Sequence, residues 1–84
     1  AEMPTCRLTE EDFKEGTIDI LGVLAVSGLT ASRSEARRAV EQGGVAVDGE
    51  KITDIKTLYR PEDFDGDGIV VKRGKKNFKR VVMG

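Results

Sequence analysis

The chain has 84 residues, enough for one compact core but too few for a catalytic domain with a second module. It contains one Cys and no His, which excludes a disulfide framework, a cysteine-rich zinc site and a Cys-His nucleophile pair. No apolar run reaches the roughly 20 residues of a membrane span, and the first residues lack the basic start of a secretory signal. We therefore expect a soluble, cytoplasmic protein with no membrane partner.

The formal net charge of -1 hides an uneven distribution of charge along the chain. Residues 1–19 carry six acids against two bases, whereas residues 69–84 carry six bases and no acid. A polyanion responds to local charge rather than to the total. The basic end of the chain is therefore a candidate binding surface.

The chain is predicted to divide into a polar lead-in from a preceding domain, residues 1–16, and a folded domain, residues 17–84. It begins with Ala1 rather than Met, which suggests a piece of a larger protein. Within the lead-in, Thr9 is placed to cap a short turn rich in acids. From Thr17 the apolar spacing predicts a first helix, and Gly28 predicts its end in a left-handed conformation.

A second helix is predicted to begin at a capping box, Ser32-Arg33-Ser34-Glu35. In such a box the serine oxygen accepts from a free backbone N–H, while the glutamate side chain reaches back to another. Residues 36, 39 and 40 are small or apolar and form the buried stripe of this helix. Gly43-Gly44 ends it.

Two hairpins are predicted after the helices. The first spans residues 45–52, where Asp48-Gly49 tolerates the positive backbone angles of a tight turn. Residues 53–68 are predicted to be a connection, in which Arg60-Pro61 interrupts any helix. The second hairpin has strands at residues 69–71 and 78–82. The predicted fold is therefore α+β, with two or three short helices packed on a small, mostly antiparallel sheet.

Residues 63–68 resemble the opening of a calcium-binding loop, with acids at its first, third and fifth positions and Gly at its sixth. Such a loop needs a bidentate Glu at its twelfth position, which here is Gly74, and flanking helices. We therefore expect a polar turn and no metal site.

The second helix carries three arginines that are candidates for phosphate binding. Arg33 and Arg37 fall on one ridge beside the buried stripe, and Arg38 points nearly opposite it. Guanidinium groups match phosphate oxygens, and the helix N-terminus adds backbone donors. The alternative is a solvated helix face on which Arg37 pairs only with Glu41. The hairpin favours the phosphate interpretation, because it places Gln42, the glycine amides and Lys51 near the same helix end.

A second group of bases surrounds Gly74. The turn is expected to project Lys72, Arg73, Lys75 and Lys76 from one tip. The alternative is an edge strand that its lysines protect from aggregation. Phe78 could stack on a base, but we expect a small core with few aromatic residues to bury it.

Two stretches of the chain resemble a known family. Residues 29–54, LTASRSEARRAVEQGGVAVDGEKITD, resemble the S-four RNA-binding domain, which several RNA enzymes share. Residues 69–81, IVVKRGKKNFKRV, are similar to the closing hairpin of bacterial tyrosyl-tRNA synthetases. The chain departs from the family pattern at Asp48, where Asn is usual. Because an acid repels phosphate, Asp48 is left out of the expected contacts.

The resemblance implies a noncatalytic domain at the C-terminal end of a tyrosyl-tRNA synthetase, which grips tRNA-Tyr near its long variable arm. It implies no cofactor here, since ATP and tyrosine would bind the catalytic domain of such an enzyme. It also implies a monomeric isolated domain and a homodimeric parent. The residues expected to contact RNA are Arg33, Ser34, Arg37, Arg38, Gln42, Gly44, Lys51, Lys72, Arg73, Lys75 and Lys76.

Two other functions stay open at this point. One is an S-four module of a ribosome-associated protein or a pseudouridine synthase. The other is a protein-protein docking domain, in which the acidic lead-in and the basic tail are complementary surfaces. An independent enzyme is not expected, because no cluster of His, Cys or paired carboxylates converges in the chain.

Overall fold

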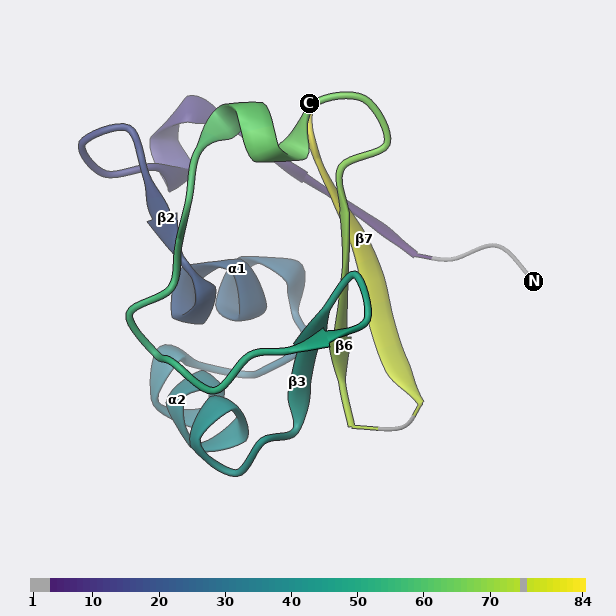
Figure 1. Ribbon diagram of the computed structural model, residues 1–84. Coiled ribbons are helices and arrows are strands. Elements are labelled where there is room, and N and C mark those ends of the chain that lie inside the picture. Colours follow the sequence, from purple (N-terminus) through teal and green to yellow (C-terminus); the bar gives the residue numbers. More distant parts are fainter. Residues whose placement is uncertain (1–3, 75) are drawn as a thin grey trace.

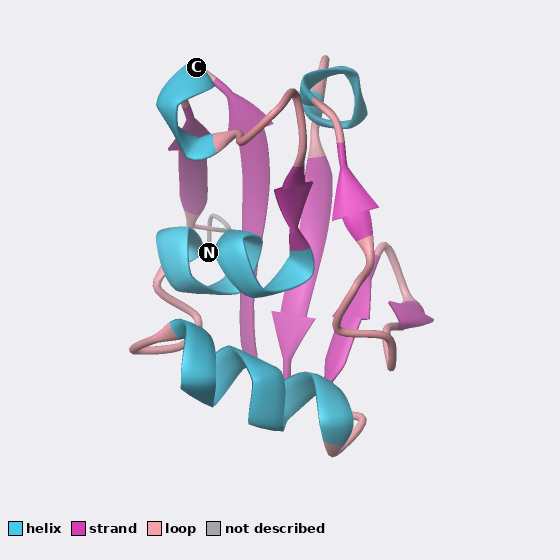
Figure 2. Ribbon diagram, turned by 90° about the vertical axis from the view of Figure 1, so that its left-hand side faces the viewer, coloured by secondary structure: helices cyan, strands magenta, loops and turns pink. Residues whose placement is uncertain are grey.

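The computed structural model describes residues 4–74 and 76–84. Two α-helices, α1 and α2, lie on one side of a five-stranded sheet (Figures 1 and 2). The sheet has the order β1-β7-β6-β3-β4, and its neighbouring strands are antiparallel except for β1 with β7. This arrangement confirms the predicted α+β class. In the described ranges, no helix is long and apolar enough to cross a membrane.

Helix α1 (Ile20–Ser27) begins at Ile20 and not at Thr17, so the predicted start was wrong. The Asp19 carboxylate caps the helix by accepting from the Gly22 N–H at 2.8 Å. The two residues before the helix form β2 (Ile18–Asp19), which pairs with β5 (Leu58–Tyr59). The predicted end is confirmed, because Gly28 has a φ of 80° and its N–H bonds to carbonyls of the last turn.

Helix α2 (Arg33–Glu41) begins where the sequence predicts, since the Ser32 hydroxyl accepts from the Glu35 N–H at 3.2 Å. The other half of the predicted capping box differs. The Glu35 carboxylate pairs with Arg73 Nη2 at 3.0 Å, because a half-buried cation is a stronger partner than a solvated backbone N–H. The stripe at residues 36, 39 and 40 is buried against the core, which leaves the arginines of this helix outside.

Both predicted hairpins are confirmed. Strands β3 (Val45–Val47) and β4 (Glu50–Lys51) meet at Asp48-Gly49, where φ is 51° and 87°. The Asp48 carboxylate accepts from the Val70 N–H at 3.0 Å, which ties this turn to the next hairpin. That hairpin consists of β6 (Ile69–Arg73) and β7 (Asn77–Met83).

The segment expected to be a lead-in contributes two elements to the fold. These are β1 (Thr5–Leu8) and the 3-10 helix η1 (Glu10–Asp12), which begins with the Asp12 carboxylate accepting from the Thr9 N–H at 2.9 Å. Strand β1 runs parallel to β7, and its Leu8 is fully buried. The sequence did not predict this strand, because its partner lies at the other end of the chain.

An aromatic cluster closes one end of the core. Phe64 is fully buried at the end of the 3-10 helix η2 (Pro61–Phe64), inside the segment predicted to be a connection. Its ring centroid lies 5.9 Å from that of Phe13 and 6.0 Å from that of Tyr59. Burial, together with the nearby Asp63 carboxylate, raises the pKa of Tyr59 to about 12. The connection therefore contributes the largest fully buried side chain of the core.

Candidate nucleic-acid interface

The two basic regions of the sequence meet at one end of the molecule. The Gly74 N–H, in the β6–β7 turn, donates to the Gly44 carbonyl, just after α2, at 2.7 Å. Strands β3 and β6 continue this contact, with Val45 opposite Arg73. We call this point the Gly44–Gly74 junction. It places the end of α2 and the tip of the second hairpin side by side.

On the helix side of the junction lies a groove of about 600 Å³. Arg38 and Gln42 line it from the last turns of α2, and Asn77 lines it from the start of β7. No acid pairs with Arg38 among the residues that the structure describes. The groove thus offers the Arg38 guanidinium and two side-chain amides as donors to phosphate or sugar oxygens, while Arg73 and Glu35, which also line it, are paired with each other.

On the sheet side of the junction lies a second groove, of about 410 Å³, lined by Lys51 and Lys72. Both lysines are exposed and flank Ala46, their cross-strand neighbour. The stem of Lys51 passes close over Gly43, where an added Cβ would lie 2.5 Å from Lys51 Cε. Glycine at that position therefore leaves the space that Lys51 occupies beside the helix end.

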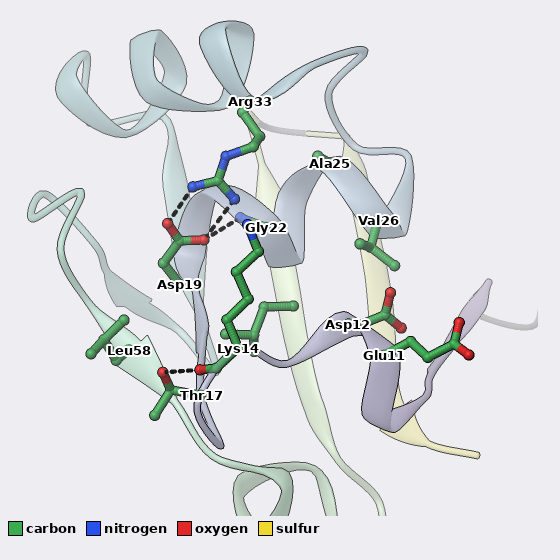
Figure 3. A pocket seen from close by; sticks show the side chains of 11 residues that line it. Glu11, Asp12, Lys14, Thr17, Asp19, Gly22, Ala25, Val26, Arg33 and Leu58 are labelled. Carbon is green, nitrogen blue, oxygen red and sulfur yellow. Dashed lines mark hydrogen bonds and ion pairs between the residues drawn. The ribbon is translucent and has the colours of Figure 1, made fainter.

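Two of the expected RNA contacts are bound inside the domain. Arg33 makes a two-point ion pair with Asp19, at 2.9 Å and 2.5 Å, across to the start of α1 (Figure 3). Arg73 is half-buried, donates to the Leu29 carbonyl at 3.1 Å and pairs with Glu35. Both arginines therefore hold the helices in place, on each other and on the sheet.

The remaining expected contacts are more accessible. Arg37 Nε lies 3.3 Å from Glu41 Oε1, which is the helix-face pair given above as the alternative. Both side chains are more than half exposed, and such a pair contributes little to stability. Ser34 and Lys76 are exposed as well, and Lys75 lies outside the described residues.

Some of the residues expected to contact RNA thus lie together at the junction, and the others lie elsewhere on the domain. We define the junction surface as Arg38, Gln42, Gly44, Lys51 and Lys72. Sequence reasoning missed Asn77, which lies in the groove beside Arg38. Its position directly after the lysine-rich turn was the only signal for it.

The Asp19–Arg33 pair makes a prediction about pH. The Arg33 guanidinium and the Gly22 N–H lower the pKa of Asp19 below its ordinary value of 3.8, so folding favours the ionised carboxylate. The stabilisation is complete above that ordinary value and is lost as the pH falls through the lower folded one. We expect Asp19→Asn, which keeps a capping side chain, to cost about 0.5–1 kcal/mol at pH 7 and less at pH 2.

Urea unfolding of both proteins at the two pH values checks this, with Glu11→Gln as the control because Glu11 is an exposed acid that lines the pocket beside Asp19 and Arg33 (Figure 3). A difference between wild type and Asp19→Asn that stays the same at both pH values would contradict the prediction.

The fold and the site define a small α+β module whose exposed cations gather around one junction. Comparison with known proteins gives its family. Residues 1–81 match the model of the tyrosine-tRNA ligase SYY-like C-terminal domain, and the chain belongs to that family.

Curated relatives agree with this assignment. The chain is 42% identical over 81 residues to the tyrosine-tRNA ligase of Clostridium botulinum (strain Loch Maree / Type A3), covering 96% of the chain and 19% of the relative. It is 43% identical over 82 residues to that of Treponema denticola, covering 96% and 20%. It is 34% identical over 83 residues to that of Clostridium tetani, covering 99% and 20%. The chain thus spans about a fifth of the length of these relatives.

These matches confirm the resemblance to the closing part of tyrosyl-tRNA synthetases. They do not favour a ribosome-associated module, a pseudouridine synthase module or a docking domain.

Proposed function

We propose that this domain binds tRNA-Tyr through the junction surface and holds it for aminoacylation by the catalytic part of a tyrosine-tRNA ligase. The observation that carries the proposal is the Gly44–Gly74 hydrogen bond, which joins the two basic regions into one continuous site. The family and the names of its relatives point to tRNA as the polyanion. The domain positions the tRNA, and ATP and tyrosine bind to the catalytic part of the ligase. The ligase works in the cytoplasm.

The residues divide between contacting RNA and supporting the contact. Arg38, Lys51 and Lys72 meet phosphates, and Gln42 and the Gly44 backbone lie near the sugar edge. Arg37 joins them at small cost, because its exposed pair with Glu41 is weak. The further contacts are Ser34, Lys75 and Lys76.

Arg33 and Arg73 have a different part in this proposal. Their ion pairs fix α2 against α1 and against β6, which sets the positions of the contacting side chains. Their remaining N–H groups can still reach a phosphate at the edge of the site. We expect each to affect stability as well as RNA affinity.

The RNA is recognised mainly by shape. Phosphate contacts from arginine and lysine set register and orientation without reading bases, and a double-stranded arm displays its backbone and 2′-hydroxyls. A long variable arm would present such a backbone to the two grooves. We propose that the isolated domain acts as a monomer and that the parent ligase is a homodimer.

Selectivity for tRNA-Tyr gives a direct test. The 84-residue chain should bind tRNA-Tyr more tightly than a tRNA with a short variable arm, because the short arm cannot reach both grooves at once. Fluorescence anisotropy at several salt concentrations measures both affinities, and the steeper salt dependence should belong to tRNA-Tyr. Equal affinities and equal salt slopes would show that this domain does not select tRNA-Tyr.

A further inference from the structure

The five-stranded sheet has an outer face that the helices do not cover. In Figure 1 both helices lie on one side of β3, β6 and β7, and no described helix lies on the other. Side chains alternate between the two faces along each strand, and cross-strand partners share a face. The buried residues Val45, Val71 and Val81 mark the helix side.

The opposite phase of the strands places cations and apolar side chains together on the outer face. Four cross-strand neighbours on successive strands form a row, in the order Phe78 (β7), Lys72 (β6), Ala46 (β3) and Lys51 (β4). The same phase carries Arg80 on β7, opposite Val70 of β6, and Arg7 on β1, opposite Val82 of β7. None of the described residues in this phase of the strands is an acid.

Phe78 is the exposed aromatic residue of this face. It retains 40% of its surface, so the expectation that the core buries it was wrong. The reason is the phase of β7: Val81 points into the core, and a residue three positions away points outward. Lys72 stands beside it on the neighbouring strand, and Arg80 two positions along the same strand.

The two ends of the face differ in the contacts that their polar groups make. At the end away from the junction, the Asp48 carboxylate binds the Val70 N–H and Arg80 Nη1 donates to the Asp67 carbonyl at 2.8 Å. At the other end, Lys51 and Lys72 line the sheet-side groove of the junction. The outer face is therefore continuous with the junction surface at the end that carries Lys51 and Lys72.

We propose that this outer face binds a single-stranded stretch of RNA, with an unpaired base stacked on Phe78 and phosphates held by Lys72 and Arg80. An aromatic ring on a cationic sheet suits single-stranded nucleic acid, because every base has a stacking face and the backbone follows the positive charge. The inference rests on the proposed function only in taking RNA as the ligand. It assigns a second contact, made with a base, to the part of this face around Phe78, which lines neither groove of the junction.

The test uses the 84-residue chain and two probes, an adenosine hexaribonucleotide and a ribose-phosphate hexamer of equal length without bases. With the first, NMR should show upfield shifts of the Phe78 ring protons. With the second, only the amides near Lys72 and Arg80 should move. Phe78→Leu should weaken binding of the adenosine hexamer by about 5- to 150-fold, whereas Phe78→Trp should preserve it. Binding of the abasic hexamer should stay unchanged in both variants.

The controls separate this inference from the proposed function. Because Phe78 is exposed, its variants should fold, which amide spectra verify. Arg38→Ala should weaken tRNA-Tyr and leave the adenosine hexamer bound. An unchanged affinity of Phe78→Leu for the adenosine hexamer, or unshifted ring protons, would overturn the inference. A protein would then be the better candidate for the partner of this face. Loss of tRNA-Tyr selectivity with a retained Phe78 effect would instead overturn the proposed function alone.

Discussion

Phe64→Ala should lower the free energy of unfolding by about 3–5 kcal/mol, the largest effect we expect from a single side chain. Phe64 is fully buried, and its removal leaves a cavity between Phe13 and Tyr59, which come from distant parts of the chain. Tyr59 is held by the β2–β5 pairing, and Phe13 by its backbone bond to the Glu10 carbonyl of η1, so they cannot close around the gap. Urea unfolding followed by circular dichroism measures the loss.

Two further variants keep this prediction testable in so small a domain. Phe64→Leu removes less volume and should cost less than alanine, so it reports on a protein that still folds. Phe78→Ala removes the same atoms from an exposed site and should change stability little. Equal losses for Phe64→Ala and Phe78→Ala would show that the aromatic cluster does not anchor the core.

The second large effect concerns binding. A triple variant, Arg38→Ala with Lys51→Ala and Lys72→Ala, should weaken tRNA-Tyr binding on the order of 100-fold or more at about 0.1 M salt. Each lost phosphate contact should also reduce the steepness of the plot of log affinity against log salt by about one. Anisotropy titrations across a salt series provide both quantities.

A matched triple variant controls for net charge. Lys14→Ala, Lys56→Ala and Arg60→Ala also remove two lysines and one arginine, all exposed and all outside the junction grooves. We expect this variant to retain most of the affinity and the salt slope. Equal losses in the two triple variants would mean that the domain attracts RNA by its overall charge and not through the junction surface.

Local signals in the sequence predicted much of the fold. The serine before α2, Gly28 after α1 and Asp48-Gly49 in the first hairpin each act within a few residues, through a cap or a backbone angle. Such signals need no knowledge of the distant chain. The helices and both hairpins were therefore predictable, except for the start of α1, where Asp19 had not been recognised as the cap.

Pairings between distant segments were not predictable in this way. Strand β1 depends on β7, and the roles of Arg33 and Arg73 depend on Asp19 and Glu35 in other elements. The sequence therefore indicated residues of the right type for a phosphate site. It did not show which of them form ion pairs within the domain. Phe78 is a different case, since its phase relative to Val81 was visible in the sequence and outweighs a general preference of aromatic residues for the core.

The hydrogen bond between Gly74 and Gly44 also affects the entropy of binding. It directly continues the ladder between β3 and β6, so the helix end and the turn have a fixed separation before any ligand arrives. RNA that binds there need not order two independent basic segments, which a flexible tail of the same charge would require. In the proposed complex, this fixed separation would suit one spacing of phosphates, and RNA of another shape would bind less tightly because the protein does not adjust to it.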